Sequence, residues 1–147
     1  MITYDRILVP TDGSDASANA IEHAVGIAAR YDATLHALHV VDAGPDSTPD
    51  AGGLAADELR AGGEKSVEAV AERAEDAGVA FETVVDAGVA YRSIVEYVDE
   101  NDIDLVVMGT RGRSGIHRFL LGSVAEKAVR TVDAPVMTVR PDLGTEE

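Results

Sequence analysis

The chain shows its architecture most clearly at LVVMGTRGRSG, residues 105–115. The first four of these residues form an uninterrupted apolar run, which is typical of a strand buried on both faces of a parallel sheet. Gly109, Gly112 and Gly115 follow directly, and glycine lets the backbone turn tightly and approach a ligand because it has no Cβ. We therefore expect a buried strand that ends in a ligand-binding loop.

Outward from this stretch, strand-like and helix-like segments alternate along the whole chain. Ser14 or Ser17 is expected to cap the first helix, and Gly78 to end the second. The alternation predicts one α/β domain over residues 1–147, with a doubly wound, five-stranded parallel sheet that helices cover on both faces. The strands are predicted at residues 6–10, 34–41, 79–85, 104–109 and 135–140, the second helix at residues 57–77 and the fourth at residues 124–132.

Two segments are expected to lie outside the sheet and its helices. Residues 42–56 hold two prolines and three glycines with few large apolar side chains, which predicts a flexible loop. Residues 142–147 are expected to form a frayed tail.

The composition of the chain is strongly acidic, with 27 acidic and 12 basic residues and a formal net charge of -15. Such a surface repels nucleic acids and anionic membranes, so neither is expected as a partner. With Lys65 and Lys127 as its only lysines, the chain is predicted to be halophilic, the alternative being an ordinary acidic protein.

Asp5 and Arg6 interrupt the first apolar run, and no apolar run reaches the about 20 residues of a membrane span. We expect a soluble, cytoplasmic protein.

The glycine-rich loop differs in charge from the rest of the chain. Residues 105–125 contain no Asp or Glu but hold Arg111, Arg113 and Arg118. A helix is expected to start near Ser123, and its free N–H groups and dipole favour an anion. Successive loop amides also form anion-binding concavities. A polyphosphate fits these features, and the alternative is that the loop pairs with acids elsewhere in the fold.

Two familiar phosphate-binding patterns are excluded. The loop has no lysine, so it is not a P-loop, and it lacks the GxGxxG spacing of dinucleotide-binding loops. No general base or covalent nucleophile is recognisable near it. His36 and His39 have an odd offset that points them to opposite faces of a strand, which argues against a shared metal ion.

Gly109-x2-Gly112-x9-Gly122-Ser123 resembles the ATP-binding motif of the universal stress protein family, G-2x-G-9x-G-(S/T). ILVPTDGS at residues 7–14 and LHVVD at residues 38–42 are similar to that family's first strand and second strand end, and the resemblance covers essentially the whole chain. It implies the strand order 3-2-1-4-5, of the adenine nucleotide alpha hydrolase-like or Rossmann-like type. It also implies ATP, with Mg²⁺ or Mn²⁺, and a homodimer formed through antiparallel pairing of the last strand at residues 135–140.

The resemblance further implies roles for single residues. The backbone of Val40 would border the adenine, and Asp12 would lie near the ribose or the metal ion. Arg113 is added on charge alone. The expected nucleotide contacts are Pro10, Thr11, Asp12, Val40, Met108, Gly109, Arg111, Gly112, Arg113, Gly122, Ser123 and Val124, with no catalytic residue.

Alternatives remain for the residues and for the whole chain. Asp12 could only hold its turn through an Asx bond, and Ser123 with Glu126 fits a capping box. The expected function is an ATP-binding regulatory or stress-response protein with slow or no hydrolysis. The alternatives are an ATPase or nucleotidyl-transferring enzyme on the same fold and a nucleotide-free dimeric interaction module, against which the intact glycine motif argues.

Overall fold

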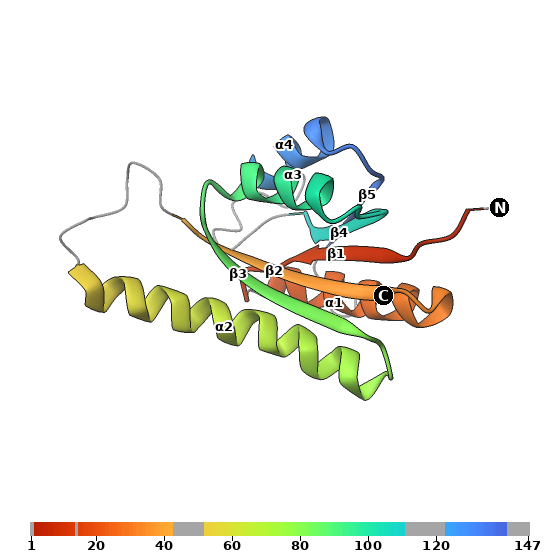
Figure 1. Cartoon of the computed structure of the whole chain (residues 1–147), viewed down its shortest axis with the longest axis horizontal. Helices are drawn as coiled ribbons and strands as arrows, with labels where there is room; N and C mark the ends of the chain where they lie inside the picture. The colour runs from red at the N-terminus through yellow and green to blue at the C-terminus, as the bar shows by residue number, and fades with distance from the viewer. Residues whose placement is uncertain (1, 14, 43–51, 111–122, 141–147) are drawn as a thin grey trace.

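The computed structural model describes residues 2–13, 15–42, 52–110 and 123–140. Within them, the strands form one parallel sheet in the order β3-β2-β1-β4-β5 (Figure 1). The predicted fold class and strand order are therefore confirmed. The elements are β1 (Arg6–Pro10), α1 (Asp15–Tyr31), β2 (Thr34–Asp42), α2 (Gly52–Asp76), β3 (Phe81–Gly88), α3 (Ala90–Glu100), β4 (Leu105–Gly109), α4 (Ser123–Thr131) and β5 (Val136–Val139).

The sheet is the middle layer of three, with α1 and α2 on one face and α3 and α4 on the other (Figure 1). Ile7, Leu8 and Val9 of β1 are all 0% exposed. Successive side chains of a strand point to opposite faces, and so Ile7 and Val9 join the core under α1 and α2, whereas Leu8 joins the core under α3 and α4. An uninterrupted apolar strand is stable here because both faces are covered.

The junction between α2 and β3 corrects the predicted start of the third strand. Gly78 has a φ of 73°, a conformation that glycine adopts without strain. The Val79 N–H donates to Ala74 O at 2.8 Å and the Gly78 N–H to Glu75 O at 3.1 Å, the pair of bonds of a Schellman cap. The predicted helix end at Gly78 is confirmed, and β3 begins at Phe81 rather than at Val79 because Val79 is used in this cap.

The predicted loop over residues 42–56 is wrong at its far end, since α2 begins at Gly52. Gly52 and Gly53 stand in the first turn of α2, where backbone N–H groups have no intrahelical partner in any sequence. Leu54, Ala55 and Ala56 follow immediately, and leucine and alanine favour a helix.

Two strands form the edges of the sheet, β3 and β5. On β5, Met137 is 37% exposed, and among the residues that the structure describes the strand pairs only with β4. A free strand edge is a surface for adding a further strand, and pairing of β5 with a second copy of the chain stays a prediction. In the described ranges no helix combines the length and apolarity that crossing a membrane requires.

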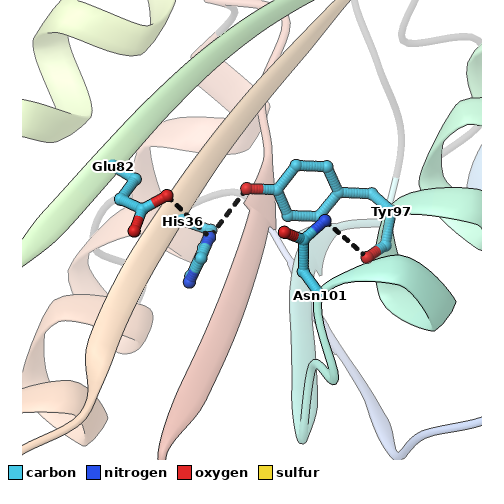
Figure 2. Close-up of polar contacts among 4 residues, drawn as sticks. All are labelled: His36, Glu82, Tyr97 and Asn101. Atoms are coloured by element: carbon cyan, nitrogen blue, oxygen red, sulfur yellow. Dashed lines mark hydrogen bonds and ion pairs between the residues drawn. The ribbon is translucent and has the colours of Figure 1, made fainter.

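The two histidines of β2 lie on opposite faces of the sheet, as their spacing predicts. His36 shares a hydrogen bond with Tyr97 of α3, with 2.7 Å between Nδ1 and Oη, while the ring of His39 packs against Gly63 of α2. Figure 2 shows His36 between Tyr97 and Glu82 of β3, whose Oε1 is 3.9 Å from Nδ1. The Asn101 side chain donates to Tyr97 O at 3.1 Å, which ties the end of α3 to the same cluster.

The stability of the fold is expected to depend on pH through His36. Burial lowers the pKa of His36 below its ordinary value of 6.5, the Glu82 carboxylate opposes this, and the Arg6 guanidinium adds to it. The unfolded chain takes up this proton more readily than the folded chain does. The free energy of unfolding therefore falls as pH drops through about 6.5, until His36 also protonates in the folded chain.

Urea unfolding at a series of pH values between about 7.5 and 5.5 measures this effect. A His36→Gln protein should have a flatter profile than the wild type. His23→Gln changes an exposed histidine of α1 and should keep the wild-type slope. Equal slopes in wild type and His36→Gln would show that His36 does not carry the dependence.

Candidate functional site

The direction of winding of the sheet reverses beside β1. From β1 the chain adds β2 and β3 on one side, and then it crosses to add β4 and β5 on the other. The carboxyl ends of β1 and β4 are therefore neighbours at the point of reversal. In open sheets of this kind, ligands bind in the crevice outside the strand ends at that point.

The turn that follows β1 is held from several directions. The Thr11 N–H donates to Leu38 O at 2.9 Å, and the Gly13 N–H donates to Thr11 Oγ1 at 3.2 Å. Gly13 has a φ of 78°, which glycine tolerates best. Thr11 is buried and Asp12 is half-buried. Asp12 thus occupies the middle of a turn whose two flanking residues are fixed.

Ser17 supports the same turn, which corrects its predicted role as a helix cap. It lies inside α1, which begins at Asp15, and its Oγ is 3.2 Å from Thr11 Oγ1. Both side chains are buried. A buried hydroxyl needs a hydrogen-bonding partner, and each of these two supplies one to the other. Ser14, the other predicted cap, lies outside the described residues.

The second strand contributes His39 and Val40 to this edge. The His39 Nδ1–H donates to Thr11 O at 2.9 Å, and Val40 is half-buried against the core under α3 and α4. The sequence alone did not single out His39 as part of the site. The parallel register pairs Pro10 with Leu38, so His39, the next residue of β2, lies beside Thr11. The contact could be predicted only if this register were known.

The fourth strand brings Met108 and Gly109 to the same edge. The Met108 side chain is buried in the core under α3 and α4, while Gly109 is the last residue of the strand. The Thr110 N–H donates to Val139 O at 3.1 Å. This bond continues the pairing with β5 by one residue and fixes where the chain leaves the sheet.

The start of α4 lies at this edge too, because α4 runs back from it to the start of β5. Ser123 is the first residue of α4 and is exposed, and Val124 packs against the core. The Glu126 carboxylate accepts a hydrogen bond from Arg130 at 3.2 Å, one turn further along the helix. One carboxylate oxygen of Glu126 is used in this bond, and the capping box of Ser123 with Glu126 stays a prediction.

Eight of the predicted contact residues are therefore gathered at one edge, at the ends of three adjacent strands and the start of one helix. The other four, Arg111, Gly112, Arg113 and Gly122, lie outside the described residues. In the part of the chain that the structure describes, no three His, Asp or Glu side chains form a group that could hold a metal ion. The eight residues are Pro10, Thr11, Asp12, Val40, Met108, Gly109, Ser123 and Val124.

These features define a doubly wound α/β protein with its candidate site at the β1–β4 reversal. The family model described as Universal stress protein family matches residues 3–140, and the chain belongs to this family. Universal stress protein MJ0531 of Methanocaldococcus jannaschii is 40% identical over 140 residues, which cover 93% of this chain and 82% of the relative.

Solved structures agree with this assignment. Universal stress protein UspA from Lactobacillus plantarum superposes with a TM-score of 0.83 at 31% identity, covering 95% of this chain and 100% of that one. A universal stress protein in complex with cAMP superposes with a TM-score of 0.70 at 30% identity, covering 96% of this chain and 100% of that one.

Proposed function

We propose that this protein binds ATP at the β1–β4 edge and acts in regulation or stress response, with little or no hydrolysis. The observation that carries the proposal is the meeting of the β1 turn, the ends of β2 and β4 and the start of α4 at the one place where such a sheet binds ligands. These segments are far apart in the sequence.

The chemistry of the two halves of this edge suits the two halves of a nucleotide. On the β1–β2 side, the half-buried Val40 and Asp12 offer an apolar contact for the base and a carboxylate for the ribose hydroxyls. On the β4–α4 side, the exposed Ser123 stands at a helix start, where free N–H groups and the helix dipole attract phosphate. The glycine motif between β4 and α4 adds further amides and has no acidic residue.

The relatives support an adenine nucleotide as the class of ligand. The universal stress protein solved with cAMP shares 30% of its sequence with this chain and its whole length is covered. ATP is a more specific proposal than an adenine nucleotide in general. It rests on the glycine motif with its arginines, which suits a chain of several phosphates better than a single phosphate.

Calorimetric titration with Mg-ATP in high salt tests the proposal. We expect saturable binding of one nucleotide per chain, and no release of phosphate at ordinary enzymatic rates. Asp12→Asn should weaken binding by about tenfold, as expected for one charge-assisted hydrogen bond. Asp102→Asn is the matched control, since Asp102 lies in the α3–β4 connection at the opposite edge, and it should bind as the wild type does.

Three results would contradict the proposal. A flat titration from folded protein would remove ATP as the ligand. Rapid turnover of ATP that is lost in Asp12→Asn would make the protein an enzyme instead. Equal weakening in Asp12→Asn and Asp102→Asn would move the site away from the β1 turn.

A further inference from the structure

His39 touches both the candidate site and the longest helix. Its Nδ1–H donates to Thr11 O at 2.9 Å. Since a carbonyl oxygen only accepts, this bond fixes which ring nitrogen carries the proton. On its other side the ring lies against α2. One half-buried side chain thus connects the β1 turn to a helix on the face of the sheet.

The contact with α2 depends on the glycine at position 63. A Cβ at Gly63 would lie 2.6 Å from His39 Cδ2, 3.2 Å from His39 Cγ and 3.2 Å from Val85 Cγ1. At the adjacent Gly62, a Cβ would meet nothing within 4 Å. Glycine destabilises the interior of a helix relative to alanine. The His39 ring explains why residue 63 is a glycine, because the Cβ of any other residue would collide with the ring.

This contact lies where α2 begins to extend past the sheet. Residues 57–62 are all exposed, Leu59 at 56%, and Gly63 is the first buried residue that follows. Figure 1 shows the first turns of α2 extending beyond the ends of β2 and β3, on the side where β2 meets the candidate site. The Ser66 hydroxyl donates to Gly62 O at 3.1 Å, a bond that often bends helices.

We propose that His39 is a positioning residue for the nucleotide site, seated on Gly63 and holding the Thr11 carbonyl so that the turn through Asp12 keeps its binding geometry. This inference rests on the proposed function, since it names what orients the β1 turn for the ligand. The carbonyl of the Thr11–Asp12 peptide accepts a hydrogen bond from His39, while the Thr11 N–H donates to Leu38 O and the Thr11 hydroxyl accepts from the Gly13 N–H. Without the bond from His39, the peptide that carries Asp12 is free to move.

Two substitutions at position 39 separate the hydrogen bond from the packing. His39→Phe keeps a ring against Gly63 and has no donor. His39→Asn loses the ring, but its amide nitrogen takes the place of Nδ1 and can donate to Thr11 O. We expect Mg-ATP affinity to fall about fivefold in His39→Phe, the usual worth of one hydrogen bond, and to stay within about twofold of wild type in His39→Asn.

The glycine pair supplies a second test. Gly63→Ala should displace the ring and weaken Mg-ATP binding by a similar factor, about fivefold. Gly62→Ala adds the same methyl group in open space and should leave affinity unchanged. A spectroscopic signature accompanies these changes: in ¹H–¹⁵N spectra of the nucleotide-free protein, the Asp12 amide should shift in His39→Phe and Gly63→Ala but not in Gly62→Ala.

The outcomes separate this inference from the proposed function. Wild type that binds Mg-ATP, together with a His39→Phe protein of equal affinity and an unmoved Asp12 amide, overturns the role of His39 and leaves the function standing. Equal losses in His39→Phe and His39→Asn overturn it as well, because they assign the effect to packing. Wild type that fails to bind overturns the function and this inference with it.

Discussion

A Gly112→Val protein is expected to lose affinity for Mg-ATP by about 100-fold or more while keeping its fold. In the proposed site, the phosphates approach the backbone amides of the motif from Gly109 to Ser123. A valine side chain branches at Cβ and would occupy the space that glycine leaves for the ligand. Titration calorimetry measures the loss of affinity, and far-ultraviolet circular dichroism establishes that the sheet and helices persist.

Gly26→Val is the control for this substitution. Gly26 lies in α1, and a Cβ there would meet nothing within 4 Å, so the variant should bind Mg-ATP as the wild type does. Undiminished affinity in Gly112→Val would mean that the loop after β4 does not hold the phosphates.

The largest effect on stability is expected at the centre of the sheet. Leu8 is 0% exposed and pairs with His36 of β2 on one side and Val106 of β4 on the other. Truncation to alanine removes buried methyl groups and leaves a cavity that surrounding strands cannot fill. Leu8→Ala should lower the free energy of unfolding by about 3 kcal/mol, within the usual range for a buried leucine.

The same substitution at Leu59 is a matched control, because that side chain is 56% exposed on α2. Leu59→Ala should change the free energy of unfolding by no more than about 0.5 kcal/mol. Urea unfolding in high salt compares the two variants with the wild type. Similar losses at both positions would contradict the assignment of the core to the sheet.

Much of the fold could be predicted from the sequence because its strands are buried on both faces. Apolar runs such as Ile7-Leu8-Val9 can be recognised as strands without knowing which strands pair with them. The predicted ends of β1 and β4 agree with the observed ends to within one residue. The alternation of strand-like and helix-like segments predicted a sheet covered by helices on both faces, whereas the strand order came from the family resemblance.

The errors occur where local and long-range signals compete. Val79 looks like the start of a strand, yet its N–H closes the cap of α2 on Ala74 O at 2.8 Å. Gly52 looks like part of a loop, yet it begins α2. In both cases the residue types fit two structures. Ala74 packs in the core and anchors the cap that Val79 closes, whereas Gly52 begins a part of α2 that extends past the sheet, where Leu54, Ala55 and Ala56 favour a helix.

The candidate site was predictable in part for a similar reason. Glycine spacing and strand ends are local features, and together with the family resemblance, which supplied Val40, they predicted twelve residues, of which the structure gathers the eight that it describes at one edge. The contact of His39 with Thr11 O spans 28 positions in the sequence. It follows from the register of β1 and β2 and from the position of the His39 ring against Gly63, neither of which a single sequence displays.

The position of the ligand is tested most directly by ¹H–¹⁵N correlation spectra recorded while Mg-ATP is added in high salt. We expect progressive shifts of the Thr11, Asp12 and Gly109 amides, with the amides of Asp5 and Asp104 at the opposite edge unmoved. Spectra that do not change, or changes gathered around Asp5 and Asp104, would contradict a nucleotide site at the β1–β4 reversal.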